Sequence, residues 1–133
     1  MKKILCFLLA AVMSLSLVSC LGNIEDVRVD IEPSEIYSEE EIDDAVYEVL
    51  HYFKREFGGC TLTELNYSEA KNTVATDEWA AQYDADQAIV LTSTFRVTGK
   101  TDGSLAYGET YKNWSWILVR NSRGDWEVKT SGY

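Results

Sequence analysis

The sequence predicts an α+β domain in which one long N-terminal helix and a short helix pack on a curved, mostly antiparallel four-stranded sheet. Three observations predict it: an amphipathic segment over residues 38–57, β-branched segments gathered in a block after it, and a hydrophobic content of 46% in 133 residues. This length and composition suffice for one hydrophobic core. Strands that follow a helix in a block, and do not alternate with helices, favour an antiparallel sheet.

Local signals at both ends define the long helix. Ser38 followed by Glu41 makes a capping box, and Gly58 provides a C-terminal stop. Between these signals the apolar residues recur with the period of a helix, so that they fall on one stripe. The stripe, which we expect to lie against the sheet, consists of Ile42, Val46, Val49, Leu50, Phe53 and Phe57.

The segments after this helix are rich in strand signals. We expect a first strand over residues 60–67 and then a short helix that Thr76 opens as its N-cap. Long strands are predicted over residues 88–98 and 113–121. A tight turn over residues 121–124 then leads into a last strand with Trp126, Val128 and Thr130.

The N-terminus is typical of an exported protein. Lys2 and Lys3 precede an uncharged run that becomes richer in serine toward Cys20. Residues 17–20 (LVSC) resemble the bacterial lipoprotein signal, which implies cleavage before Cys20, acylation of its thiol with palmitate-type chains, and anchoring in the cell membrane or outer membrane on the extracytoplasmic side. An uncleaved anchor or an ordinary signal peptide are the alternatives.

Three parts of the chain follow from this interpretation. Residues 1–19 are the signal peptide, residues 20–37 are the lipidated cysteine and an acidic tether, and residues 38–133 are the domain. Within the tether, alternation of Val27, Val29 and Ile31 with charged residues is compatible with a short edge strand. Cleavage leaves Cys60 as the one further cysteine, so we expect no internal disulfide.

The net charge of -10 argues against nucleic acid as a partner, because an acidic chain is repelled by phosphate groups.

Two pairs of segments resemble a known family. Residues 111–120 (YKNWSWILVR) with 124–128 (GDWEV) resemble the terminal hairpin of the nuclear transport factor 2-like superfold, also called cystatin-like or SnoaL-like. Residues 36–42 (IYSEEEI) with 59–65 (GCTLTEL) resemble small bacterial lipoproteins that carry a domain of unknown function on that fold. Enzymes of the superfold, such as ketosteroid isomerase, have their active site in a cone between the helices and the curved sheet. The resemblance implies that an active site of this chain, if it has one, would lie in the same place.

Catalysis has little support from the residues themselves. The predicted inner stripe of the helix carries no carboxylate, and the one histidine, His51, falls on its outer face. We therefore assign no catalytic residue, metal ligand or cofactor, and the interpretation as an isomerase or dehydratase remains the alternative. The preferred function is a membrane-anchored binding or interaction module of unidentified ligand.

The predicted working surface lies on the tryptophan-bearing strand. Its residues are Trp114, Trp116, Tyr111 and Arg96. The strand is apolar on both faces, so that one face needs a cover besides the long helix. A homodimer is the first choice, a loop over residues 99–110 could also cover it, and an envelope glycan or a small apolar molecule are the candidate ligands. Both tryptophans could instead be ordinary core residues.

Overall fold

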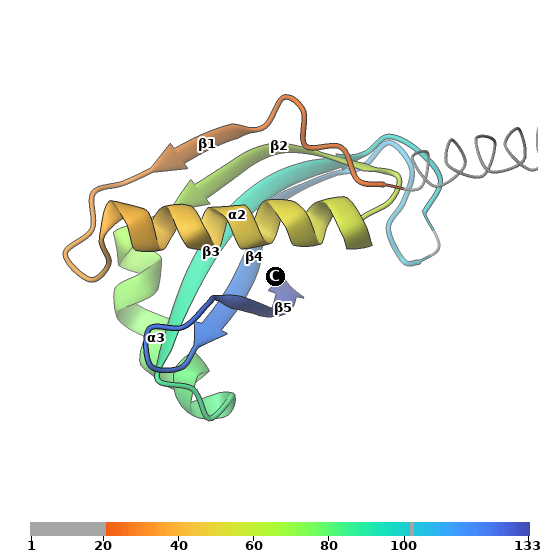
Figure 1. Ribbon diagram of the computed structural model, residues 1–133. Coiled ribbons are helices and arrows are strands. Elements are labelled where there is room, and N and C mark those ends of the chain that lie inside the picture. The colour runs from red at the N-terminus through yellow and green to blue at the C-terminus, as the bar shows by residue number, and fades with distance from the viewer. Residues whose placement is uncertain (1–20, 102) are drawn as a thin grey trace, which may run out of the picture.

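The computed structural model describes residues 21–101 and 103–133, so the predicted signal peptide and Cys20 lie outside the described residues. Among the described residues, no helix is both long and apolar enough to span a bilayer. Two helices and five strands follow one another along this part of the chain (Figure 1). They are β1 (Arg28–Ile31), α2 (Glu39–Glu56), β2 (Cys60–Tyr67), α3 (Glu69–Gln82), β3 (Gln87–Val97), β4 (Thr110–Arg120) and β5 (Glu127–Gly132).

The sheet has five strands, in the order β1-β2-β3-β4-β5, and it is mixed. β1 pairs with β2 in parallel, and the other neighbours pair antiparallel. The prediction of a four-stranded sheet behind an N-terminal helix is therefore wrong, because a strand precedes α2 in the chain. The alternation of Val27, Val29 and Ile31 is compatible with this edge strand, but the predicted sheet does not include it, because charged side chains that stay in water are also typical of an acidic tether.

The packed structure also begins well before residue 38. Asn23 pairs with Thr61, the amide of Leu62 donates to the carbonyl of Asn23 (2.9 Å), and the amide of Glu32 donates to the carbonyl of Tyr67 (3.2 Å). Most of the segment that the sequence suggests as a tether is thus attached along β2.

The long helix forms where the sequence predicts it. Both hydrogen bonds of the capping box between Ser38 and Glu41 are present, and acidic residues occupy its first turn. α2 crosses one face of the sheet, while α3 lies behind it (Figure 1). The buried residues of α2 are Ile42, Ala45, Val46, Val49 and Phe53.

The second helix is longer than predicted and begins earlier. α3 has 14 residues and starts after Ser68, so Thr76 lies within it and is not its N-cap. The Thr76 hydroxyl donates to the carbonyl of Asn72 (2.6 Å), one turn back. A threonine inside a helix can satisfy its hydroxyl in this way, which makes Thr-Asp-Glu an ambiguous start signal.

A bulge in β4 decides which of its side chains face α2. Ser93 is opposite Trp114 and Phe95 is opposite Tyr111, so β4 contains one residue more than β3 between these pairs. Asn113 lies in the bulge with a φ of 58°. As a result Tyr111 shares the α2 face with Trp114, although an uninterrupted strand would place them on opposite faces.

The predicted turn over residues 121–124 is confirmed. Ser122 and Arg123 have φ values of 51° and 59°, and the Gly124 amide donates to the carbonyl of Asn121 (2.8 Å). Two positive φ values in succession give a turn whose twist matches the strands of a hairpin.

Candidate functional site

The structure brings three of the four predicted binding residues together. Trp116 is fully buried beneath α2, and its indole N–H donates to the Ser93 hydroxyl (2.8 Å). Trp114 and Tyr111 are half-buried, with ring centroids 5.8 Å apart. Arg96 is exposed between the buried residues Phe95 and Val97, so its side chain points to the opposite face of β3.

These aromatic residues belong mainly to the core. The ring of Tyr111 stacks on Phe95 at 5.1 Å, and Trp114 meets Phe95 edge-on at 5.2 Å. A hollow of about 260 Å³ adjoins Trp114 near the C-terminal end of α2. That volume lies below the range of about 300–1,000 Å³ that is usual for ligand sites.

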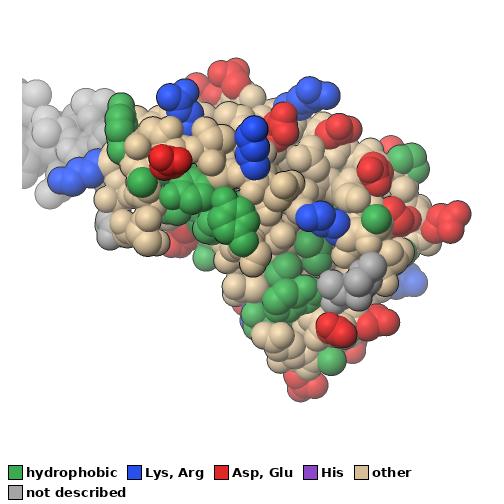
Figure 2. All heavy atoms as spheres, turned by 180° about the vertical axis from the view of Figure 1, so that it is seen from behind, with side chains coloured by type: hydrophobic (Ala, Val, Ile, Leu, Met, Phe, Trp, Pro, Cys, Tyr) green, Lys and Arg blue, Asp and Glu red, His purple; other side chains and the backbone are tan. Residues whose placement is uncertain are grey.

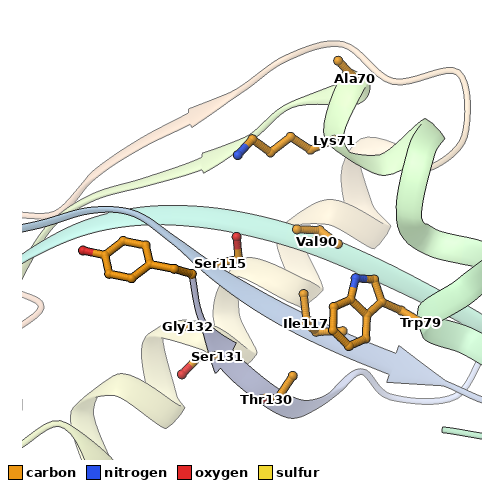
Figure 3. Close-up of a pocket in the computed structure, with 10 residues that line it drawn as sticks. Ala70, Lys71, Trp79, Val90, Ser115, Ile117, Thr130, Ser131 and Gly132 are labelled. Atoms are coloured by element: carbon orange, nitrogen blue, oxygen red, sulfur yellow. The ribbon is translucent and has the colours of Figure 1, made fainter. Parts of the chain in front are cut away.

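A larger hollow lies on the sheet face opposite α2, and we call it the open-face hollow. Its volume is about 510 Å³, and residues of α3 and of strands β3, β4 and β5 surround it (Figure 3). Its lining consists of Ala70, Lys71, Trp79, Val90, Ser115, Ile117, Thr130, Ser131, Gly132 and Tyr133.

The floor of the open-face hollow is apolar. Val90 and Ile117 are neighbours in the β3–β4 register and are almost fully buried, at 5% and 4% exposure. Trp79 of α3 stands beside them, and Lys71 extends over the sheet from the start of the helix (Figure 3). Space-filling atoms on this side of the molecule show apolar side chains gathered around the hollowed region (Figure 2).

Among the described residues that line the hollow, Lys71 is the one charged residue. Between described residues, ion pairs join Arg120 to Glu41 and Lys129 to Glu127, and neither involves Lys71. Hydroxyl groups of Ser115 and Thr130 supply further polar contacts, whereas the side chain of Ser131, which is opposite Trp116 in the register, lies on the α2 face. The hollow can therefore hold a hydrocarbon body on its floor and an anionic group at Lys71.

The described groups with a shifted pKa lie elsewhere and stabilise the fold. The amide of Ser38, and also Arg120, lower the pKa of Glu41 below its ordinary value. Burial raises the pKa of the Cys60 thiol, which makes it a poor nucleophile. No group of three histidine, cysteine or acidic residues that could hold a metal ion occurs in residues 21–101 and 103–133.

Compared with protein-family models, curated proteins and solved structures, the chain has no significant match. The resemblance to nuclear transport factor 2-like lipoproteins therefore stays a prediction. The open-face hollow was not predicted from the sequence. The predicted short helix starts at Thr76, whereas α3 starts at Glu69, and only the longer helix carries both Lys71 and Trp79 to the hollow. The sequence did indicate that β4 is apolar on both faces. Its second face is covered partly by α3 and partly borders the hollow.

Proposed function

We propose that the chain is an envelope lipoprotein whose domain binds a small apolar molecule carrying an anionic group. The lipoprotein signal at Cys20 supports anchoring on the extracytoplasmic side of the cell membrane or outer membrane. The observation that carries the binding function is the open-face hollow, with its apolar floor and its single cation. In a chain of net charge -10, a lysine at an apolar hollow is the feature that selects an anion.

Other occupants fit this hollow less well. A glycan needs many polar partners, whereas Val90 and Ile117 offer none on the floor. A second copy of the chain would bring together two chains that each have a net charge of -10, which costs association energy. The enzyme alternative needs a cone between α2 and the sheet, but the space there is filled by the core residues of α2, β2, β3 and β4.

Calorimetric titration with myristate and with myristyl alcohol tests the proposal. We expect both probes to bind, with the carboxylate preferred, because Lys71 can pair with it. Replacing Thr130 by Trp fills the hollow from β5 and should abolish binding, whereas Thr110→Trp at the exposed start of β4 is a matched control that should not.

The charge of Lys71 is tested separately. Lys71→Gln should lower the preference for carboxylate over alcohol by about threefold, as expected for a solvent-exposed ion pair. Arg123→Gln removes the same charge in the turn after β4 and should leave the preference unchanged. A chain that binds neither probe, or one in which Thr130→Trp binds as well as the unmodified chain, would contradict the proposed function.

A further inference from the structure

The chain is fixed to the domain immediately after the predicted lipidation site. Gly22, the second residue after Cys20, is buried, and its amide donates to the carbonyl of Lys54 at 2.9 Å. A Cβ atom at Gly22 would lie 2.5 Å from the carbonyl oxygen of Phe53 and 2.9 Å from that of Phe57. The close approach therefore requires glycine, and it leaves Leu21 as the only residue between Cys20 and the fold.

Three segments meet at this end of the molecule. The Asn23 amide donates to the carbonyl of Cys60 (2.9 Å), next to the end of α2, and the Gly99 amide donates to the carbonyl of Gly59 (2.9 Å). Figure 1 shows the start of the described chain, the end of α2 and the loop between β3 and β4 lying together. We call this the anchor end and define it as residues 21–26, 54–59, 96–101 and 103–112.

Exposed apolar and aromatic side chains occur at the anchor end. Tyr107, in the β3–β4 loop, is 79% exposed, and Leu21 is 39% exposed. Tyrosine is enriched where proteins meet the headgroup region of a bilayer, because its ring is apolar and its hydroxyl is polar.

The charges of the domain are polarised along the same direction. The anchor end carries five bases and four acids in its described sequence, so it is close to neutral. The described residues 21–101 and 103–133 contain ten bases (12 less Lys2 and Lys3) and 21 acids (22 less Asp102). Outside the anchor end this leaves five bases and 17 acids. An anionic surface would therefore repel the acidic rest of the domain, but it would not repel the anchor end. The five bases at the anchor end are Lys54, Arg55, Arg96, Lys100 and Lys112.

We propose that the anchor end lies directly on the anionic bilayer that holds the lipid, with Tyr107 and Leu21 in the headgroup region. This inference rests on the lipid attachment at Cys20 in the proposed function. The acidic first turn of α2, at the other end of that helix, then points away from the membrane. The domain is held at the surface in one orientation and does not hang from a flexible spacer.

The test uses the lipidated protein, cleaved before Cys20, in vesicles of equal parts phosphatidylglycerol and phosphatidylcholine. A nitroxide is attached at Tyr107→Cys or, as the matched control at the far end of α2, at Glu40→Cys. Cys60 is 2% exposed, so the unmodified chain should take up no label. At position 107 we expect collisions with lipid-soluble oxygen to exceed those with a water-soluble nickel complex, and at position 40 we expect the reverse.

Charge variants test the electrostatic part. Lys54→Gln combined with Lys100→Gln should lower the ratio of docked to undocked protein by about fivefold for each lysine removed. Label 107 should then become more accessible to the water-soluble nickel complex. Lys129→Gln combined with Arg123→Gln removes the same charge from the rest of the domain and should leave label 107 protected. All variants should still float with the vesicles, because the acyl chains hold them.

The outcomes separate the two proposals. If the unmodified protein floats no better than Cys20→Ala, the anchor is wrong and the orientation fails with it. If the protein floats but label 107 is as exposed to the nickel complex as label 40, the orientation alone is overturned. Full protection of label 107 in the Lys54 and Lys100 double variant would overturn the role of these charges.

Discussion

Tyr37 shows how single residues connect the start of α2 to the sheet. Its hydroxyl donates to the carbonyl of Ala88 in β3, and its ring lies edge-on to Trp126 at 5.7 Å. Burial raises the pKa of Tyr37 to about 12, chiefly because the phenolate would be desolvated. The sequence indicates only that Tyr37 precedes the helix cap, since its partners are distant in the chain.

This environment makes a prediction for alkaline pH. The pKa of Tyr37 is raised on folding, so its contribution to stability is complete below the ordinary value of 10 and is lost as pH rises toward about 12. Tyr37→Phe should lower the free energy of unfolding by about 1 kcal/mol near neutral pH. By about pH 11 the two proteins should be equally stable, because ionisation costs the unmodified chain about 1 kcal/mol.

Urea unfolding at both pH values measures this difference. Tyr107→Phe, which removes an exposed hydroxyl, is the control, and it should leave the free energy of unfolding unchanged at both pH values. A difference between Tyr37→Phe and the unmodified chain that stays constant with pH would show that the Tyr37 hydroxyl is not held in a buried hydrogen bond.

At the scale of elements, Asn72 explains why α3 is attached where it is. β2 pairs with β3 only as far as Thr92, which leaves the backbone of Val90 without a strand partner on that side. The Asn72 amide donates to the carbonyl of Val90 (2.9 Å), and its oxygen accepts from the amide of Val90 (2.8 Å). One buried side chain therefore replaces a strand at this edge and positions Lys71 beside it.

Replacing Asn72 by Ala should be strongly destabilising. It leaves two buried backbone groups of Val90 unsatisfied, and we expect a loss of about 3 kcal/mol in the free energy of unfolding. Thr73→Ala, an exposed change on the next residue of α3, should alter it by less than about 0.5 kcal/mol. Denaturant unfolding monitored by circular dichroism would measure both, and equal stabilities would refute this role for Asn72.

These elements also show what the sequence could predict. α2 was predictable because its cap, stripe and stop are all local, and the turn at residues 121–124 carries its own signal. The alternation in residues 27–31 indicated that β1 could be a short strand, but not that it pairs in parallel with β2, which is distant in the chain. The start of α3 was not predictable, because Ser68 makes no side-chain cap. The bulge at Asn113 likewise hid which face Tyr111 would occupy.

At the scale of the whole molecule, the candidate site depends on contacts between segments far apart in the chain. The open-face hollow joins residues 70–79 to the last four residues, 130–133. The ring centroids of Tyr133 and Trp114 are 5.3 Å apart. Tyr133 also lines the hollow, so it links the predicted tryptophan surface to the hollow. Sequence reasoning correctly indicated that β4 needs two covers, but the identity of the second cover depended on the placement of α3.

The proposed ligand site is tested most directly by mapping amide chemical shifts of the protein on addition of myristate. We predict that the shifts concentrate on residues 70–79 and on the β4 and β5 residues that line the open-face hollow. Thr130→Trp should remove them. Shifts confined to α2 or to the loop between β3 and β4, or no localised shifts at saturating myristate, would contradict the assignment of this hollow as the binding site.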